Sequence, residues 1–145
     1  MSRSKRIKVI HDIAAREETL MAQQVSDKLF DLQSEERRLE QLVAYLEEYR
    51  QLAADEHDSV EMSIIRGRRQ FVERLQVCVR HQQALVESLC DQLERQMEEW
   101  NQARSKSTAI QRFAERTDAQ QQTLETRREQ ARLDEVGRLQ FAGKT

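Results

Sequence analysis

The side chains in this sequence that could take part in chemistry are two cysteines, three histidines and many carboxylates. Cys78 and Cys90 lie twelve residues apart, which is about 18 Å along a helix, so they cannot form a disulfide within one chain. His11, His57 and His81 have no metal-ligand spacing with these cysteines. We therefore expect both cysteines to be small apolar packing residues in a reducing compartment.

Other kinds of catalytic or cofactor site are also missing from the sequence. No glycine-rich loop precedes a helix, so no phosphate cradle is predicted. The few serines have no partner histidine at a plausible spacing, and carboxylates on exposed helices act as solvating groups. We expect no cofactor, no bound metal and no enzymatic activity, so that the protein acts by contacting other macromolecules.

The composition is typical of long helices packed side by side. The 145 residues include no proline and only three glycines, while 34% are charged and 5% are aromatic. The net charge of −2 gives no overall attraction to nucleic acid, and Arg66, Arg68 and Arg69 lie close to several acidic residues. No stretch has the apolar length of a membrane span or a secretory signal. We expect a cytoplasmic protein with no nucleic-acid partner and no insertion into a membrane.

Apolar residues at alternating steps of four and three predict one long helix over residues 6–55. We call this set the first seam, and it comprises Ile7, His11, Ala14, Glu18, Met21, Val25, Lys28, Leu32, Glu35, Leu39, Leu42, Leu46, Tyr49 and Ala53. Its most apolar part runs from Leu39 to Ala53, so the firmest packing is predicted near the end of this helix. Polar and charged residues occupy most other positions.

The repeat stops at a polar segment and then restarts, which predicts a hairpin. We expect a turn region over 56–66, a second helix over 67–136 and a loose C-terminus over 137–145, together forming a single unit over 1–145. The second helix is about 30 Å longer than the first, and this overhang is expected to fray or to need a partner. The predicted fold is all-α: a long antiparallel two-helix coiled-coil hairpin, monomeric when free, with an overhanging C-terminal helix end.

The second helix carries two apolar stripes from residue 65 to residue 100. The second seam comprises Ile65, Val72, Leu75, Val79, Val86, Leu89, Leu93 and Trp100, and continues through Ala103, Ser107, Ile110, Ala114, Thr117 and Leu124. Beside it, Phe71, Cys78 and Leu85 form what we call the lateral stripe. One antiparallel helix covers one seam, so the lateral stripe is either an exposed docking surface or is covered by Leu42, Tyr45 and Leu46 of a first helix that wraps widely.

Three sequence motifs resemble the flagellar export protein family FliJ over roughly residues 7–117. The first comprises Leu39, Leu42, Tyr45, Glu48, Tyr49 and Arg50, before the turn. The second comprises Gln70, Phe71 and Leu75, after the turn, and the third comprises Trp100, Ile110, Phe113, Glu115 and Arg116. The order and the spacing of the motifs, together with the position of the turn, carry the resemblance.

This resemblance implies a non-enzymatic stalk component of the flagellar type III export apparatus. Such a protein would insert the free ends of its hairpin into the export ATPase ring, link the ring to the membrane export gate and bind export chaperones. It would be cytoplasmic and be recruited peripherally to the cytoplasmic face of the inner membrane.

The resemblance also implies a row of residues that contacts the cytoplasmic domain of the export gate. In the family this row is a phenylalanine, a leucine, a small residue and a histidine, and the matching positions here are Phe71, Leu75, Cys78 and Gln82. Gln82 departs from the family pattern and keeps only a polar, hydrogen-bonding side chain.

Two alternative functions fit the same fold. One is the stalk of a virulence type III secretion system, which has the same architecture. The other is an unrelated structural coiled-coil tether, although the interruption of the heptad at residues 54–66 favours a hairpin over a parallel dimer.

Overall fold

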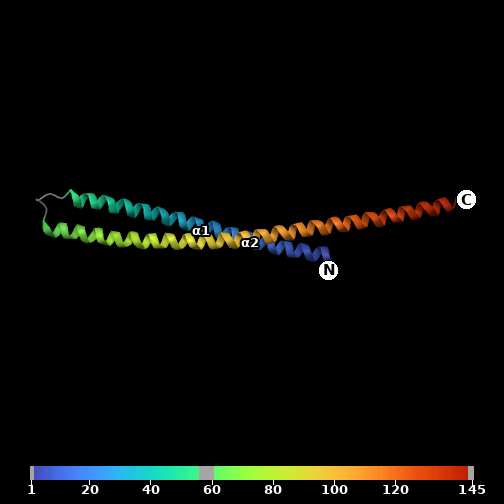
Figure 1. The fold of residues 1–145 in the computed structure, drawn as a ribbon, viewed down its shortest axis with the longest axis horizontal. Helices are drawn as coiled ribbons and strands as arrows, with labels where there is room; N and C mark the ends of the chain where they lie inside the picture. Colours follow the sequence, from blue (N-terminus) through green and yellow to red (C-terminus); the bar gives the residue numbers. More distant parts are fainter. Residues whose placement is uncertain (1, 56–60, 144–145) are drawn as a thin grey trace. The chain divides into compact units, whose positions relative to one another are not determined.

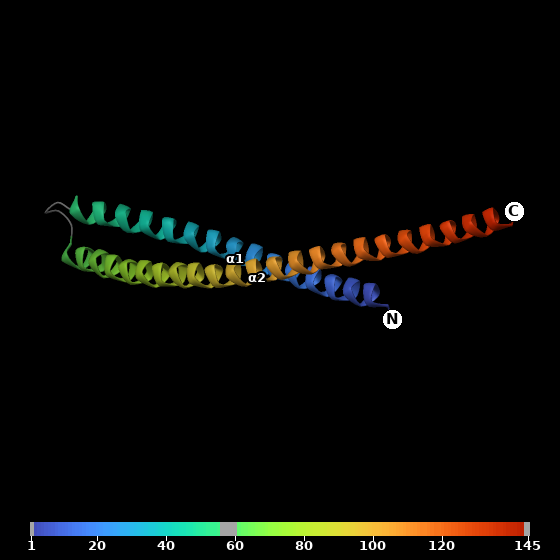
Figure 2. The ribbon, with the colours of Figure 1, turned by 45° about the vertical axis from the view of Figure 1, so that its right-hand side comes forward.

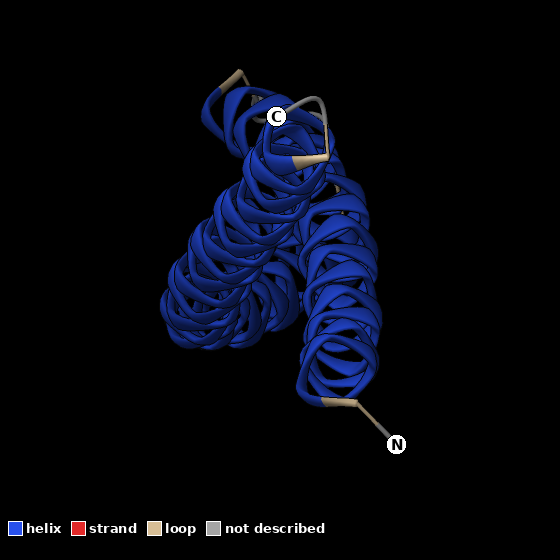
Figure 3. Ribbon diagram, turned by 90° about the vertical axis from the view of Figure 1, so that its right-hand side faces the viewer, coloured by secondary structure: helices blue, strands red, loops and turns tan. Residues whose placement is uncertain are grey.

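A computed structural model describes residues 2–55 and 61–143 of the protein, and the described part consists of two long α-helices. Helix α1 spans Arg3–Ala54 and helix α2 spans Met62–Ala142 (Figure 1). Helix is the one regular secondary structure in these described residues, as Figure 3 also shows. The helices pack against each other as a hairpin coiled coil, which confirms the predicted all-α fold class.

The helices are longer than the sequence predicted at three of their four ends. Helix α1 begins at Arg3 instead of residue 6, because the Ser2 hydroxyl accepts a hydrogen bond of 3.3 Å from the backbone N–H of Lys5. Serine at this position satisfies one of the unpaired N–H groups of a first helical turn, so it defines the helix start. At the other end, α1 stops at Ala54, within one residue of the expected limit.

Helix α2 begins at Met62, so residues 62–66 are helical and do not belong to a turn, and it continues to Ala142 through the segment predicted to be loose. Gly67 and Gly137 lie inside it, with no atom near the place where a side chain would start. A solvated glycine costs a helix only about 1 kcal/mol, which is too little to end a long one. The predicted turn residues 56–60 lie outside the described residues.

Packing divides the chain into two compact units. The central unit is Met21–Trp100, and the terminal unit combines Met1–Leu20 with Asn101–Thr145. Within each unit, a segment of α1 runs antiparallel to a segment of α2. Every position of the predicted first seam is buried or half-buried, and so is every position of the second seam except Leu124.

The core of the central unit lies close to the turn, where the seam is most apolar. Leu46, Leu75 and Val79 are buried together, and Leu39, Leu42, Tyr49 and Val72 pack around them. Further from the turn, the Lys28 ammonium donates a hydrogen bond of 2.8 Å to the side-chain oxygen of Gln92. The buried cluster lies where the seam was predicted to pack most firmly, and Ile7, Ala14 and Leu32 earlier in α1 are buried to a similar degree.

In the terminal unit, the first turns of α1 pack on α2, and α2 then continues without a partner. Ile7, Ala14, Ala103 and Thr117 are buried between the helices, and the Ser4 hydroxyl donates a hydrogen bond of 3.1 Å to Asp118. From residue 119 to residue 142 every position is exposed, which confirms an overhanging C-terminal helix end (Figure 2). The overhang is helical to Ala142, about 36 Å at the usual rise per residue.

The packing predicts unequal costs for two leucine truncations on α1. Leu46→Ala removes a side chain that is 7% exposed and should lower the free energy of unfolding by about 2–4 kcal/mol, because it leaves a cavity in the central core. Leu52→Ala removes a side chain that is 48% exposed and should cost less than about 0.5 kcal/mol. Urea unfolding followed by circular dichroism measures both, and equal costs would contradict the seam.

Candidate docking surface

The lateral stripe lies beside the central core and is open to solvent. Phe71 and Leu85 are each 42% exposed, and Cys78 is exposed as well, whereas Leu75 and Val79 on the same helix are buried. Tyr45, which would have to cover this stripe in the alternative arrangement, is itself 54% exposed. These exposures contradict the interpretation in which α1 wraps widely enough to cover both stripes, because the stripe is covered only in part.

The structure separates the four residues of the predicted gate-docking row into two pairs. Phe71 and Cys78 face solvent, but Leu75 is 9% exposed and belongs to the central core. Gln82 is half-buried, and its side-chain amide donates hydrogen bonds to the backbone carbonyl of Glu35, at 3.0 Å, and to the Glu35 carboxylate. A partner at this surface would thus meet Phe71 and Cys78, while Leu75 and Gln82 hold α2 against α1.

The Phe71 ring is held in place by an aromatic contact between the helices. Its centroid lies 4.7 Å from that of Tyr49 on α1, with the ring planes at 64°, which is an edge-to-face arrangement. Such pairs contribute about 0.5–1.5 kcal/mol beyond the area that they bury. The contact fixes one side of Phe71 and leaves the remainder of the ring available.

The other motif residues are distributed over both units and are mostly exposed. Tyr45, Glu48 and Arg50 are exposed on α1, next to Tyr49, which is half-buried. On α2, Trp100 is half-buried, while Glu115 and Arg116 are exposed. The carboxylate of Glu115 accepts a hydrogen bond of 3.3 Å from Gln111, one turn earlier. Of these motif positions, Tyr49 contacts Phe71 through its ring.

Val77 enlarges the exposed apolar surface, and the sequence analysis missed it. This valine is 43% exposed and lines a shallow hollow of ≈ 550 Å³ with Gln70, Glu73, Arg74 and Cys78. It lies on neither stripe, because it is one residue away from Cys78 on the outward side of α2. Its signal in the sequence is an apolar residue at a solvent-facing position of an otherwise charged helix face. We call Phe71, Val77, Cys78 and Leu85 the exposed edge.

The described residues offer no other kind of site at this surface. Residues 2–55 and 61–143 contain no group of three or more His, Cys, Asp or Glu side chains that could hold a metal ion. Cys78 and Cys90 are both free thiols. Over the same ranges, neither helix has a segment apolar enough for its length to cross a lipid bilayer. Apolar contact with another macromolecule is the chemistry that this surface can support.

Comparison with known proteins identifies the family of this chain. A family model described as the flagellar FliJ protein matches residues 3–145. The chain belongs to the FliJ family. No match was found among curated proteins or among solved structures.

Membership in the FliJ family decides between the functions that the sequence left open. The protein is a coiled-coil component of the flagellar export apparatus, and FliJ proteins are non-enzymatic structural components of it. A tether unrelated to export is excluded by a match that covers nearly the whole chain. The family match also favours the flagellar apparatus over a virulence secretion system.

The exposure of the edge predicts different reactivities for the two thiols. In the single variants Cys90→Ser and Cys78→Ser, each with one thiol left, Cys78 should react with Ellman's reagent several-fold faster than half-buried Cys90, because attack needs an accessible thiolate. Stopped-flow absorbance measures both rates. In urea the two rates should converge, and a faster reaction at Cys90 in the folded chain would contradict the exposed edge.

Proposed function

We propose that this FliJ-family protein is a stalk and linker of the flagellar export apparatus. Its exposed edge docks on the cytoplasmic domain of the membrane export gate, its chain ends insert into the export ATPase ring, and it also binds export chaperones. It acts in the cytoplasm as a monomer when free, and is recruited peripherally to the cytoplasmic face of the inner membrane.

The exposed edge is the observation that carries this proposal. A two-helix protein can cover its apolar residues only along one interface, yet Phe71, Val77, Cys78 and Leu85 lie together outside it. Each square ångström of apolar surface that a partner covers contributes about 25 cal/mol. The exposed part of this surface can stabilise a complex, which is the behaviour expected of a docking site.

The Tyr49–Phe71 contact supports Phe71 as the anchor of that docking. Large aromatic side chains dominate the energetics of protein interfaces, especially when their conformation is set before binding. Tyr49 holds the ring of Phe71 by its edge-to-face contact, so little side-chain entropy remains to be lost. Leu75 contributes indirectly, since it is buried in the core beneath this surface.

The overhang of α2 supports an interaction at the chain ends. This helical segment is exposed throughout, and it presents five large apolar side chains to solvent: Leu124, Leu133, Val136, Leu139 and Phe141. A helix with so little packing of its own gains most from a surrounding partner. The central opening of an ATPase ring would supply such surroundings.

A single truncation tests the docking role of the edge. Phe71→Ala should abolish or strongly reduce swimming in soft agar and weaken binding to the purified cytoplasmic domain of the export gate by roughly tenfold or more, because it removes the apolar anchor. Leu75→Ala is unsuitable for this test, since Leu75 belongs to the core and its truncation would destabilise the hairpin.

Phe30→Ala provides the matched control for this variant. Phe30 is 65% exposed on α1 and lies outside the exposed edge, so its truncation removes the same atoms elsewhere in the central unit. Circular dichroism must show both variants to be as helical as the parent chain. Normal motility and normal gate binding by Phe71→Ala would remove the docking role of the edge.

Trimming the chain ends tests the stalk role. A chain of residues 13–117 keeps the whole central unit but loses the first turns of α1 and the overhang. It should stimulate the export ATPase far less than the full chain while still binding the gate domain, because the gate contact lies in the central unit. Phosphate release and gate binding are measured on the same samples, and full stimulation by the trimmed chain would contradict insertion of the ends.

A further inference from the structure

The terminal unit contains an apolar groove between its two helices. We call it the terminal groove; it has a volume of ≈ 250 Å³ and is lined by Ile7, Ile10, Ala109, Ile110 and Phe113. Buried Ile7 and half-buried Ile110 form its floor. Ile10 and Phe113 form its walls, where they remain 52% and 47% exposed. All five side chains are apolar, so the groove offers a partner no polar contact within it.

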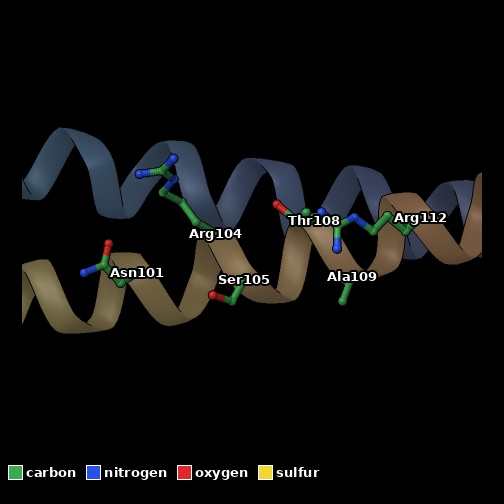
Figure 4. A pocket seen from close by; sticks show the side chains of 6 residues that line it. All are labelled: Asn101, Arg104, Ser105, Thr108, Ala109 and Arg112. Atoms are coloured by element: carbon green, nitrogen blue, oxygen red, sulfur yellow. The ribbon is translucent and has the colours of Figure 1, made fainter.

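Exposed arginines border this apolar groove on both helices. On α1, Arg6 lies one turn before Ile10 and Arg3 lies two turns before it, on the same face. On α2, Arg112 and Arg116 follow Ala109 by three and seven residues, and all four arginines are exposed. Figure 4 shows Arg112 and Ala109 lining a second hollow on α2, together with Asn101, Arg104, Ser105 and Thr108.

The acidic side chain on the same face is already paired. Glu17 lies two turns after Ile10, and its carboxylate lies 3.8 Å from the ammonium of Lys106, which is two turns before Phe113. This pair joins α1 to α2 at one end of the groove, and the charges of Glu17 and Lys106 cancel each other. The border that faces a partner is therefore positive.

We propose that the terminal groove binds an amphipathic helix of a partner protein, with apolar residues in the groove and acidic residues against the bordering arginines. A third helix laid between two antiparallel helices would insert its apolar side chains between Ile10 and Phe113, as in helix-in-groove recognition. The four exposed arginines would pair with carboxylates on the flanks of that helix. This contact rests on the proposed function, which places partners at the chain ends, and adds to it the chemistry of the helix that those ends would receive.

The shape and the charges of the groove favour this occupant over three others. A drug-sized ligand needs a pocket that encloses most of its surface, and this groove is small and open. A flat lipid surface would reach Ile10 and Phe113 but not the recessed Ile7 and Ile110. The overhang of a second copy of this chain carries as many arginines as acidic residues between 119 and 142, so it offers no acidic flank.

Binding of a designed helical peptide to the full chain tests the proposal. The probe is a fluorescein-labelled peptide of about 18 residues, with leucine at helical steps of three and four and glutamate at the flanking positions. A matched peptide carries lysine in place of each glutamate. Fluorescence anisotropy should show binding of the acidic peptide alone, with an affinity that falls as salt is raised.

Variants of the chain should then locate the binding. Phe113→Ala and Ile10→Ala should each lower the affinity for the acidic peptide by roughly tenfold. The double variant Arg112→Gln with Arg116→Gln should also lower this affinity, and should make it depend less on salt. The controls are Phe141→Ala and Val9→Ala, which truncate exposed side chains outside the groove and should leave the affinity unchanged. Thermal unfolding confirms that each variant is folded.

Several outcomes would overturn the proposal. These are failure of the acidic peptide to bind, equal binding of the lysine peptide, and equal losses in the control variants. Another such outcome is that the chain floats with vesicles of phosphatidylglycerol and phosphatidylcholine and binds no peptide. If this flotation depends on Ile10 and Phe113, the groove binds lipid. A dimer in sedimentation equilibrium that Phe113→Ala dissociates would assign it to a second copy. None of these assays includes the export ATPase or the gate, so failure here leaves the proposed stalk role standing.

Discussion

The packing of one apolar seam on another is the interaction on which the rest of this structure depends. Neither helix has a second neighbour to cover it, so each can bury only one stripe of side chains. The cluster of Leu46, Leu75 and Val79 shows this limit, since its buried side chains come from a narrow line on each helix. Apolar residues one step to the side of that line are left in solvent, and this places the exposed edge and the walls of the terminal groove.

The seam could be predicted almost completely from spacing, because heptad periodicity states which residues face a partner. The ends of the helices could not be predicted in this way, because capping and glycine effects decide them, and these effects are local and small in energy. A serine cap set the start of α1, and two glycines that look like breaks were tolerated inside α2. Within the predicted docking row, Phe71 is exposed and Leu75 is buried. A step of four residues from Phe71 to Leu75 turns the side chain by about 40°, which is enough to move it from solvent into the core.

Family membership and physical structure contribute different parts of the functional argument. The family match identifies an export component, and it cannot say which side chains of this chain are free to bind. Exposure and contacts supply that second part, since they leave Phe71 and Cys78 open to solvent and place Leu75 and Gln82 against α1. Val77 lies off the seams that periodicity reveals. The terminal groove combines two seam residues, Ile7 and Ile110, with three side chains beside them, and that combination comes from the structure.

The hydrogen bonds from Gln82 to Glu35 have a consequence for register. Two seams of leucine, valine and alanine can slide by a whole heptad with a modest change in apolar contact, whereas a polar pair across the helices is satisfied in one alignment only. Two hydrogen-bonded pairs, Gln82 with Glu35 and Lys28 with Gln92, therefore fix the register of the helices. The Tyr49–Phe71 contact exists only in this register. The family pattern has a histidine where this chain has Gln82. An amide does not titrate between about pH 5 and pH 8, so Gln82 remains a hydrogen-bond donor to Glu35 across the range in which a histidine would change its charge.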